Sequence, residues 1–425
     1  MKIKTVKRSY GEVRQIPRCA HRKPKKPWFL LSSLIRLLSV PDLIATKFRY
    51  TVEGKLPKEP CLILMNHSSF LDLKIASKIF YPRRHCVVST ADGMVGKRWL
   101  MERIGCIPTQ KYVTDLILVK DIKYALTEKK VDVLMYPEAG YSFDGRASAL
   151  PDSLGGLVKL LGVPVVTVIT EGAFFRQPLY NGLRTRKVPV RATVKCLLDC
   201  EEIKQRTADE INGMLMQEFT FDGFAWQREN RIPIADKERA VGLERILYKC
   251  AACGSEGQMH GEGAVLQCCA CKKQYEMDEY GVLRATVGET EFPHIPDWYE
   301  WEREQVREEL LTGSYRWDTE VEIGMLVDHR ALYMVGEGRL LQDENGFVLD
   351  GCDGTLHYEQ KPLASYSLNA DYYWYEIGDV VGIGNRDALY YCFPKTGSVT
   401  KARLATEELY KLRAASRRPK QKDSE

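Results

Sequence analysis

The sequence predicts an α/β domain with a mostly parallel sheet, followed by a small cysteine-rich module and a mainly β C-terminal domain. Between Cys61 and Phe219, short β-branched runs alternate with helix-like stretches, which is typical of an α/β domain built on a parallel sheet. Two cysteine pairs, each with a two-residue gap, then lie close together. From about Tyr315 onward, aromatic and β-branched runs alternate with polar residues, and Asn345-Gly346 marks a hairpin turn.

Length and composition fit this organisation. A chain of 425 residues predicts two or three domains, and 44% hydrophobic and 28% charged residues are ordinary for a folded protein. The thirteen cysteines are mostly scattered and nothing N-terminal reads as a secretory signal, so we expect a reducing, cytoplasmic location. The expected segments are 1–49 basic arm and amphipathic helix, 50–249 α/β domain, 250–285 cysteine-rich module, 290–415 mainly β domain with a terminal helix, and 416–425 basic tail.

Within the α/β domain, each expected strand is a short apolar run and each expected helix follows one of them. The strands read CLILM, HCVVST, VDVLMYPE, VPVVTVIT and VRATVKCLL, in that order. The helix-like stretches are Leu71–Phe80, Asp115–Glu128, Ser153–Leu161 and Thr207–Phe219.

The N-terminal segment concentrates positive charge. Residues 1–49 contain thirteen Lys and Arg against two Asp and Glu, a net charge of +11, whereas the remainder of the chain is negative. Met1–Lys26 is broken by prolines and is predicted to be a flexible arm. Trp28–Phe48 is apolar but interrupted by polar residues and a proline, so it is a poor membrane-spanning helix. We expect an amphipathic helix peripheral to the cytoplasmic membrane face; the alternative is a helix docked on the protein's own core.

The stretch NHSSFLD places a candidate general base at a strand end. His67 follows the expected strand Cys61–Asn66, and Asp72 comes five positions later in the first turns of a helix. Open α/β sheets bind ligands at the carboxyl ends of their strands. Asp72 can accept the second imidazole N–H, which fixes the tautomer and stabilises the charge that develops when the other nitrogen takes a proton. The pair therefore predicts a base acting on a hydroxyl.

These residues resemble the His-x4-Asp signature of the glycerolipid acyltransferases, the 1-acylglycerol-3-phosphate O-acyltransferase-like family. Three further blocks resemble the family's other motifs and occur in the same order. They are GCIPTQK over Gly105–Lys111, YPEAGYS over Tyr136–Ser142 and GVPVVTVIT over Gly162–Thr170. One such match recurs by chance, but four in order make a specific signal.

The resemblance implies an O-acyltransferase of phospholipid biosynthesis. A fatty acyl group would move from acyl-CoA or acyl-carrier protein to the hydroxyl of a lysophospholipid, most simply 1-acylglycerol-3-phosphate, at a membrane. His67 would remove the hydroxyl proton and Asp72 would orient the imidazole. The implied reaction has a single step, since the motif contains no nucleophile.

The resemblance also implies acceptor-binding residues in the second and third blocks. Lys111 takes the basic position of the second block, and Glu138, Gly140 and Ser142 belong to the third. Tyr141 stands where the family has an arginine, which removes a phosphate clamp. Arg146 could substitute for it; alternatively, the acceptor is a different lysolipid or lacks a phosphate.

The cysteine-rich module has the spacing C-x2-C-x14-C-x2-C, which is that of a zinc ribbon with four thiolate ligands. We expect a structural Zn²⁺ and leave out Cys269, because Cys268 preserves the two-residue gap. The predicted ligands are Cys250, Cys253, Cys268 and Cys271.

Two other functions were weighed. A catalytically silent lipid-binding or scaffold protein on the same fold is favoured by the altered third block, but leaves the His67–Asp72 pair without a purpose. A nucleic-acid-binding protein is suggested by the ribbon and the basic arm. Acidic residues flank the ribbon, however, and phosphate backbones require clustered cations, so we expect no nucleic-acid partner.

Overall fold

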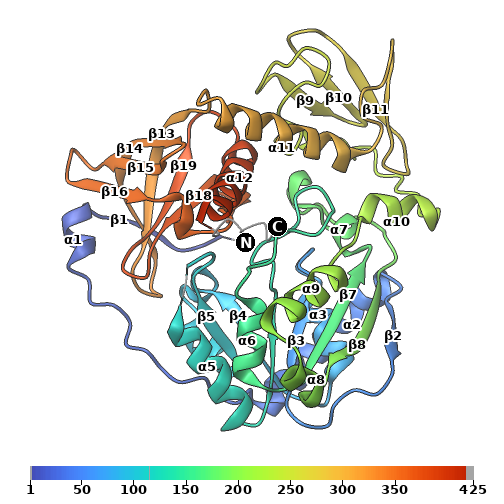
Figure 1. The fold of residues 1–425 in the computed structure, drawn as a ribbon, viewed down its shortest axis with the longest axis vertical. Coiled ribbons are helices and arrows are strands. Elements are labelled where there is room, and N and C mark those ends of the chain that lie inside the picture. Colours follow the sequence, from blue (N-terminus) through green and yellow to red (C-terminus); the bar gives the residue numbers. More distant parts are fainter. Residues whose placement is uncertain (1, 114, 418–425) are drawn as a thin grey trace, which may run out of the picture.

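The computed structural model describes residues 2–113 and 115–417. It contains three sheets, and Figure 1 shows the α/β domain below, the small cysteine-rich module at the top and the mainly β domain beside it. Of the expected basic tail, residues 418–425 lie outside the described part of the chain.

The sheet of the α/β domain has the order β2-β8-β7-β3-β6-β4-β5. Every neighbouring pair is parallel except β7 with β8. The central strand β3 therefore has parallel neighbours on both sides, as its uninterrupted apolar sequence requires. The strands are β2 (Arg49–Glu53), β3 (Leu62–Met65), β4 (His85–Thr90), β5 (Cys106–Thr109), β6 (Asp132–Met135), β7 (Val165–Glu171) and β8 (Arg191–Leu198).

Successive side chains of β3 enter two different cores because they point to opposite faces of the sheet. Leu62 and Leu64 pack in one cluster, and Ile63 and Met65 in the other. Helices α5, α6, α8 and α9 add residues to the first cluster, and α2, α3 and α7 add residues to the second. The helices of this domain are α2 (Phe29–Ala45), α3 (Asp72–Phe80), α4 (Arg98–Arg103), α5 (Leu116–Thr127), α6 (Leu154–Leu161), α7 (Ala173–Arg176), α8 (Cys200–Gln205), α9 (Ala208–Glu218) and α10 (Gly223–Glu229).

The cysteine-rich module folds as a four-stranded antiparallel sheet in the order β12-β11-β10-β9. Tyr275 of this sheet is fully buried and packs edge-on against Trp298, with ring centroids 4.9 Å apart. Trp298 belongs to α11 (Ile295–Leu311), so the module is attached to the helix that follows it. The strands are β9 (Met259–Glu262), β10 (Val265–Cys268), β11 (Gln274–Met277) and β12 (Leu283–Ala285).

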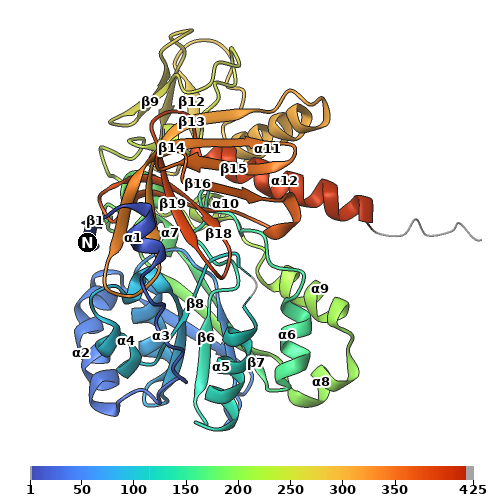
Figure 2. The ribbon, with the colours of Figure 1, turned by 90° about the vertical axis from the view of Figure 1, so that its left-hand side faces the viewer.

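The C-terminal domain is a largely antiparallel sheet in the order β16-β15-β14-β13-β19-β18-β17, packed against α12 (Val399–Arg417). Figure 2 shows α12 extending to the right of these strands. The expected hairpin turn at Asn345-Gly346 joins β14 to β15. The strands are β13 (Trp317–Leu326), β14 (Leu332–Asp343), β15 (Gly346–Gly351), β16 (Leu356–Gln360), β17 (Asn369–Trp374), β18 (Gly378–Gly384) and β19 (Leu389–Pro394).

The N-terminal arm is ordered, so the prediction of a flexible arm is wrong. Its first strand, β1 (Thr5–Lys7), pairs in parallel with β14, and the following helix α1 (Tyr10–Arg14) buries Val13 completely. Further along, His21 bonds Asp121 of α5 at 2.9 Å. The arm thus crosses from the C-terminal domain to the α/β domain (Figure 1). Strand pairing, the buried Val13 and the bond from His21 to Asp121 hold the arm in place.

Helix α2 begins one residue after Trp28 and contains Pro41. It packs on α3 but leaves a stripe of leucines in solvent; Leu30 is 80% exposed, and Leu37 and Leu38 are each 66% exposed. Over the described residues, α2 and every other helix fall short of the length and apolarity needed to cross a bilayer.

Candidate active site

His67 and Asp72 form a hydrogen-bonded pair at the end of the central strand. Nδ1 of His67 lies 2.9 Å from Oδ2 of Asp72. The same oxygen accepts the backbone N–H groups of Ser68 and Ser69, at 2.9 and 3.1 Å, so the carboxylate is fixed by its own loop. Because the buried Asp72 carboxylate lies against Nδ1, it selects the tautomer with the proton on that nitrogen. Nε2 is then free to accept a proton.

Two tyrosines from the third block hold the His67 ring between them. Tyr136 and Tyr141 each stack on it with centroids 4.1 Å apart and interplanar angles of 23° and 28°. Aromatic faces carry negative potential, so they favour the imidazolium that forms when His67 takes a proton. Tyr141 therefore has a defined place beside the base where the family motif has an arginine. This role could not be predicted from the sequence, because His67 and the two tyrosines lie on different loops.

His67 lines a cavity of about 1430 Å³ whose wall is mainly apolar. Leu116 and Leu160 line it and are also 69% and 57% exposed, so the apolar side of the cavity opens to solvent. A groove of this kind suits an acyl chain. The side chains that α5 and α6 contribute are Leu116, Leu118, Val119, Leu154, Leu157 and Leu160.

The C-terminal domain supplies another wall of the same cavity. Residues 363–366 and 371–376 line it, together with Tyr410 of α12. The site is therefore built from two domains. The contribution of the C-terminal domain to the cavity could not be predicted from the sequence, because no local pattern relates these residues to His67.

Of the five expected acceptor-binding residues, only Lys111 lies in the cavity wall formed by the described residues. Glu138 is fully buried and holds the loop instead. Its Oε1 accepts the backbone N–H of His67 at 3.1 Å, and its Oε2 accepts that of Ser148 at 2.8 Å. Gly140 is also outside the wall, and a Cβ there would approach the Tyr112 hydroxyl at 3.1 Å. Both residues shape the loop after β6, whose tyrosines stack on His67.

Ser142 and Arg146 are likewise engaged elsewhere, which corrects their expected role. The Ser142 hydroxyl donates to the carbonyl of Arg146 at 2.6 Å and accepts the N–H of Gly145 at 2.9 Å. The Arg146 guanidinium binds Asp222 at 2.9 Å and Asp297 at 2.7 Å. Because its guanidinium is bound to two carboxylates, Arg146 cannot replace the missing phosphate clamp. It connects the loop after β6 to α10 and α11.

The buried Glu138 predicts a pH-dependent contribution to stability. Burial raises its pKa to about 7, against the lowering effect of the two N–H groups. Unfolded glutamate has a pKa of about 4.3, so between these values the folded state binds more protons. The free energy of unfolding should therefore fall as pH rises through this window, by up to about 1.4 kcal/mol per pH unit.

Glu138→Gln removes this titration and is the test. Wild type and variant are unfolded in urea at steps from pH 5 to pH 7.5. We expect the difference in free energy of unfolding, wild type minus variant, to decrease as the pH rises. A difference that stays constant would show that Glu138 titrates normally.

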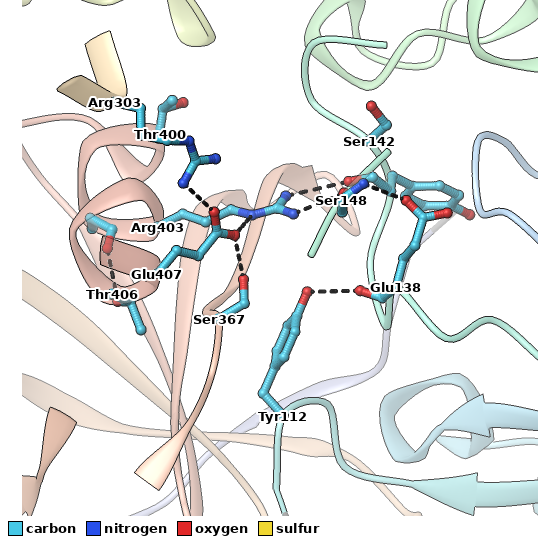
Figure 3. Close-up of polar contacts among 12 residues, drawn as sticks. Tyr112, Glu138, Ser142, Ser148, Arg303, Ser367, Thr400, Arg403, Thr406 and Glu407 are labelled. Atoms are coloured by element: carbon cyan, nitrogen blue, oxygen red, sulfur yellow. Dashed lines mark hydrogen bonds and ion pairs between the residues drawn. The ribbon is translucent and has the colours of Figure 1, made fainter. Parts of the chain in front are cut away.

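A buried ion network connects α12 to the loop after β6, which contains Tyr141 and Ser148 (Figure 3). Arg403 is 4% exposed; it donates to Glu407 at 3.1 Å, to Ser148 Oγ at 3.2 Å and to the carbonyl of Tyr141 at 3.4 Å. Arg303 of α11 reaches the other oxygen of Glu407 at 2.8 Å. Burial would raise the pKa of Glu407, but Arg303 and Arg403 lower it to about 2. The C-terminal domain is thereby fastened to the segment that holds His67.

Arg403→Met should destabilise the protein by about 3 kcal/mol or more, since breaking a buried ion network leaves uncompensated charge. Urea denaturation measures the loss. The matched control is Arg307→Met on α11, whose half-exposed guanidinium pairs with Glu408 at 3.0 Å; it should cost about 0–1 kcal/mol. Equal losses of stability in the two variants would show that the buried network around Arg403 stabilises the protein no more than an exposed ion pair does.

The four predicted cysteine ligands come together in the ribbon. Their Sγ atoms all lie within 4.8 Å of one another, with Cys250 to Cys271 and Cys253 to Cys268 each at 3.8 Å. A tetrahedral ion with S ligands at about 2.3 Å separates them by about 3.8 Å. The group could therefore hold a metal ion. It contributes no residue to the cavity that contains His67, as far as the described lining extends.

Comparison with known proteins identifies the α/β domain. Residues 47–171 match the family model "Acyltransferase". The chain carries an acyltransferase domain. The resemblance indicated by the four sequence blocks is thus confirmed, and His67, Lys111 and Tyr141 all fall inside the matched segment. The cysteine-rich module and the C-terminal domain lie beyond its end.

Among the solved structures that are similar to this chain is the 1-acyl-sn-glycerophosphate (LPA) acyltransferase PlsC from Thermotoga maritima. It is 15% identical to this chain, with a TM-score of 0.35, and the match covers 45% of this chain and 81% of that one. No curated protein matches the chain.

Proposed function

We propose that this acyltransferase moves a fatty acyl group from the thioester of acyl-CoA or acyl-carrier protein to the hydroxyl of a lysophospholipid, the class that includes 1-acylglycerol-3-phosphate. The observation that carries the proposal is the His67–Asp72 pair in the wall of a large, mainly apolar cavity. Phospholipid biosynthesis is the metabolism in which such a transfer belongs.

In the proposed reaction His67 Nε2 removes the proton from the acceptor hydroxyl as its oxygen attacks the thioester carbonyl. Asp72 keeps Nδ1 protonated and stabilises the imidazolium. The C–S bond then breaks, and the thiolate takes up the proton that His67 holds. The new ester, the free thiol and the regenerated base balance the reaction, and no acyl-enzyme is required.

The proposal is tested by incubating the purified protein with a labelled long-chain acyl-CoA, or the matching acyl-carrier protein, and a panel of lysophospholipids. Mass spectrometry should detect a diacyl phospholipid that carries the labelled chain. Absence of any acylated product with both donors, in folded protein, would contradict acyl transfer and favour a silent lipid-binding protein.

We also propose that the exposed face of α2 docks on a membrane. Leu30, Leu34, Leu37 and Leu38 recur at helical spacing along one exposed stripe, and the neighbouring Trp28 contacts the exposed Trp99, with centroids 6.1 Å apart. The apolar stripe and the tryptophans can bury apolar surface in the membrane interface, and the nearby lysines can attract anionic lipid headgroups. These are the two contributions to peripheral membrane binding. The docked face would admit lipid substrates directly from the bilayer.

The double substitution Leu37→Asp, Leu38→Asp should weaken binding to anionic phospholipid vesicles by at least about 10-fold, since each buried leucine contributes about 1.5–3 kcal/mol. Co-sedimentation measures it. Leu311→Asp, at an equally exposed leucine on α11, serves as the control. Unchanged binding of the double variant would place the membrane surface elsewhere.

For the cysteine group we propose a structural Zn²⁺. Four thiolates at tetrahedral spacing suit zinc and leave no open position for a substrate. Its role would be to hold the ribbon against α11, through contacts such as Tyr275 with Trp298.

A further inference from the structure

Lys111 and Asp371 face the same cavity from two different domains. Lys111 follows β5 of the acyltransferase domain, and Asp371 lies on β17 of the C-terminal domain. Within the described residues no ion pair joins them, and neither has a salt-bridge partner. Burial raises the pKa of Asp371 to about 6, against the lowering effect of Lys111. The cavity thus holds one cation and one carboxylate near each other, and Oδ1 of Asp371 accepts the backbone N–H of Tyr372 at 2.9 Å.

Aromatic residues follow Asp371 in the cavity wall. Residues 372–375 are Tyr-Tyr-Trp-Tyr, and all of them line the cavity. Tyr112 and Tyr366 add a further edge-to-face pair in the wall, with centroids 5.3 Å apart. Aromatic faces beside a carboxylate form a receptor for an ammonium group, because the ring quadrupoles and the negative charge both attract it. This observation is independent of the charge on Asp371.

The same wall is poorly suited to a phosphomonoester dianion. Among the described residues that line the cavity there is no arginine, and Lys97 and Lys111 face five carboxylates. Tyr141, at the family's arginine position, is stacked on His67, and Arg146 is bound to two aspartates. A doubly charged headgroup would meet more negative than positive charge. The five carboxylates are Asp92, Asp115, Asp152, Asp371 and Glu376.

We propose that the acceptor is a lysophospholipid with a zwitterionic phosphodiester headgroup, whose phosphate is bound by Lys111 and whose ammonium is bound by Asp371 and the surrounding aromatic rings. The inference rests on the proposed acyl transfer and adds the acceptor class to it. Asp371 is a specificity-determining residue, and the C-terminal domain is the part of the chain that reads the headgroup. The acyl-transfer step at His67 is the same as in the proposed function above.

Three acceptors that share one acyl chain but differ in headgroup charge distinguish the contribution of the ammonium from that of the phosphate. Lysophosphatidylethanolamine has the phosphodiester and the ammonium, lysophosphatidylglycerol has only the phosphodiester, and lysophosphatidic acid has a phosphomonoester. We expect kcat/KM to be highest for the ethanolamine lipid, by about 10-fold or more over the glycerol lipid, which is the worth of a charge-assisted hydrogen bond. Lysophosphatidic acid should be the poorest acceptor.

Asp371→Asn should lower kcat/KM for the ethanolamine lipid by about 10-fold more than kcat/KM for the glycerol lipid, and so abolish the preference between them. Asp353→Asn, at an exposed turn outside the cavity, is the matched control and should preserve the preference.

Equal use of the ethanolamine and glycerol lipids by wild type, or an equal loss on both in Asp371→Asn, would overturn the headgroup assignment while acyl transfer stands. If Asp371→Asn does not fold, the wild-type order of acceptors decides alone. Absence of transfer to all three lipids would overturn the proposed function itself.

Discussion

Replacing His67 by alanine should reduce acyl transfer by about 10²- to 10⁴-fold, the usual contribution of a general base, without unfolding the protein. The ring is partly exposed to the cavity and its removal leaves β3 and α3 intact. Initial rates of thiol release with saturating acceptor measure the loss, and the melting temperature confirms the fold.

His357→Ala is the matched control. This histidine also pairs with an aspartate, Asp350 at 2.6 Å, but on the exposed surface of the C-terminal domain. It should leave the rate within about twofold of wild type, because His357 is not among the described residues that line the cavity. A His67→Ala variant that keeps most of the wild-type rate would exclude His67 as the base.

Cys250→Ser should remove the bound metal and unfold the ribbon. Structural zinc sites contribute about 10–16 kcal/mol in small zinc domains, and Cys250 is a fully buried member of the group. Elemental analysis of the purified protein should give one zinc per wild-type chain and well below one in the variant. Thermal unfolding should shift to lower temperature because the ribbon no longer supports α11.

Cys269→Ser provides an adjacent control. Cys269 is exposed, follows the ligand Cys268 directly and lies outside the four-sulfur group. It should retain both the metal and the stability of the wild type. Stoichiometric zinc in Cys250→Ser, or a loss of zinc in Cys269→Ser, would show that the ligand assignment is wrong.

Features with a local signature could be predicted from the sequence. The alternation of β-branched runs and helices predicted β3, β4, β6, β7 and β8 of the α/β domain but missed the short strands β2 and β5. The four cysteines were predicted to group from their spacing. His67 and Asp72 were found because strand end and helix start lie only five residues apart. The parallel neighbours of β3 follow from its uninterrupted apolar run.

Features that depend on distant contacts could not be predicted. The wall formed by residues 371–376 meets His67 only through tertiary packing. Glu138 matched a motif, but the sequence does not reveal which way its side chain points. The carboxylate points toward the backbone N–H groups of the folded loops, which it accepts. Arg146 was interpreted as a free cation because its partners, Asp222 and Asp297, are remote in sequence. The arm likewise became ordered through β14, which no local pattern reveals.

The central claim is that the acyl group passes directly from thioester to acceptor at His67. The most direct measurement is a rapid-quench experiment with stoichiometric protein and labelled acyl-CoA, carried out with and without a lysophospholipid. We predict that free thiol and diacyl product form together, one for one, only when acceptor is present, and that no label remains on the denatured protein. A burst of thiol with label bound to the chain before acceptor is added would contradict this account.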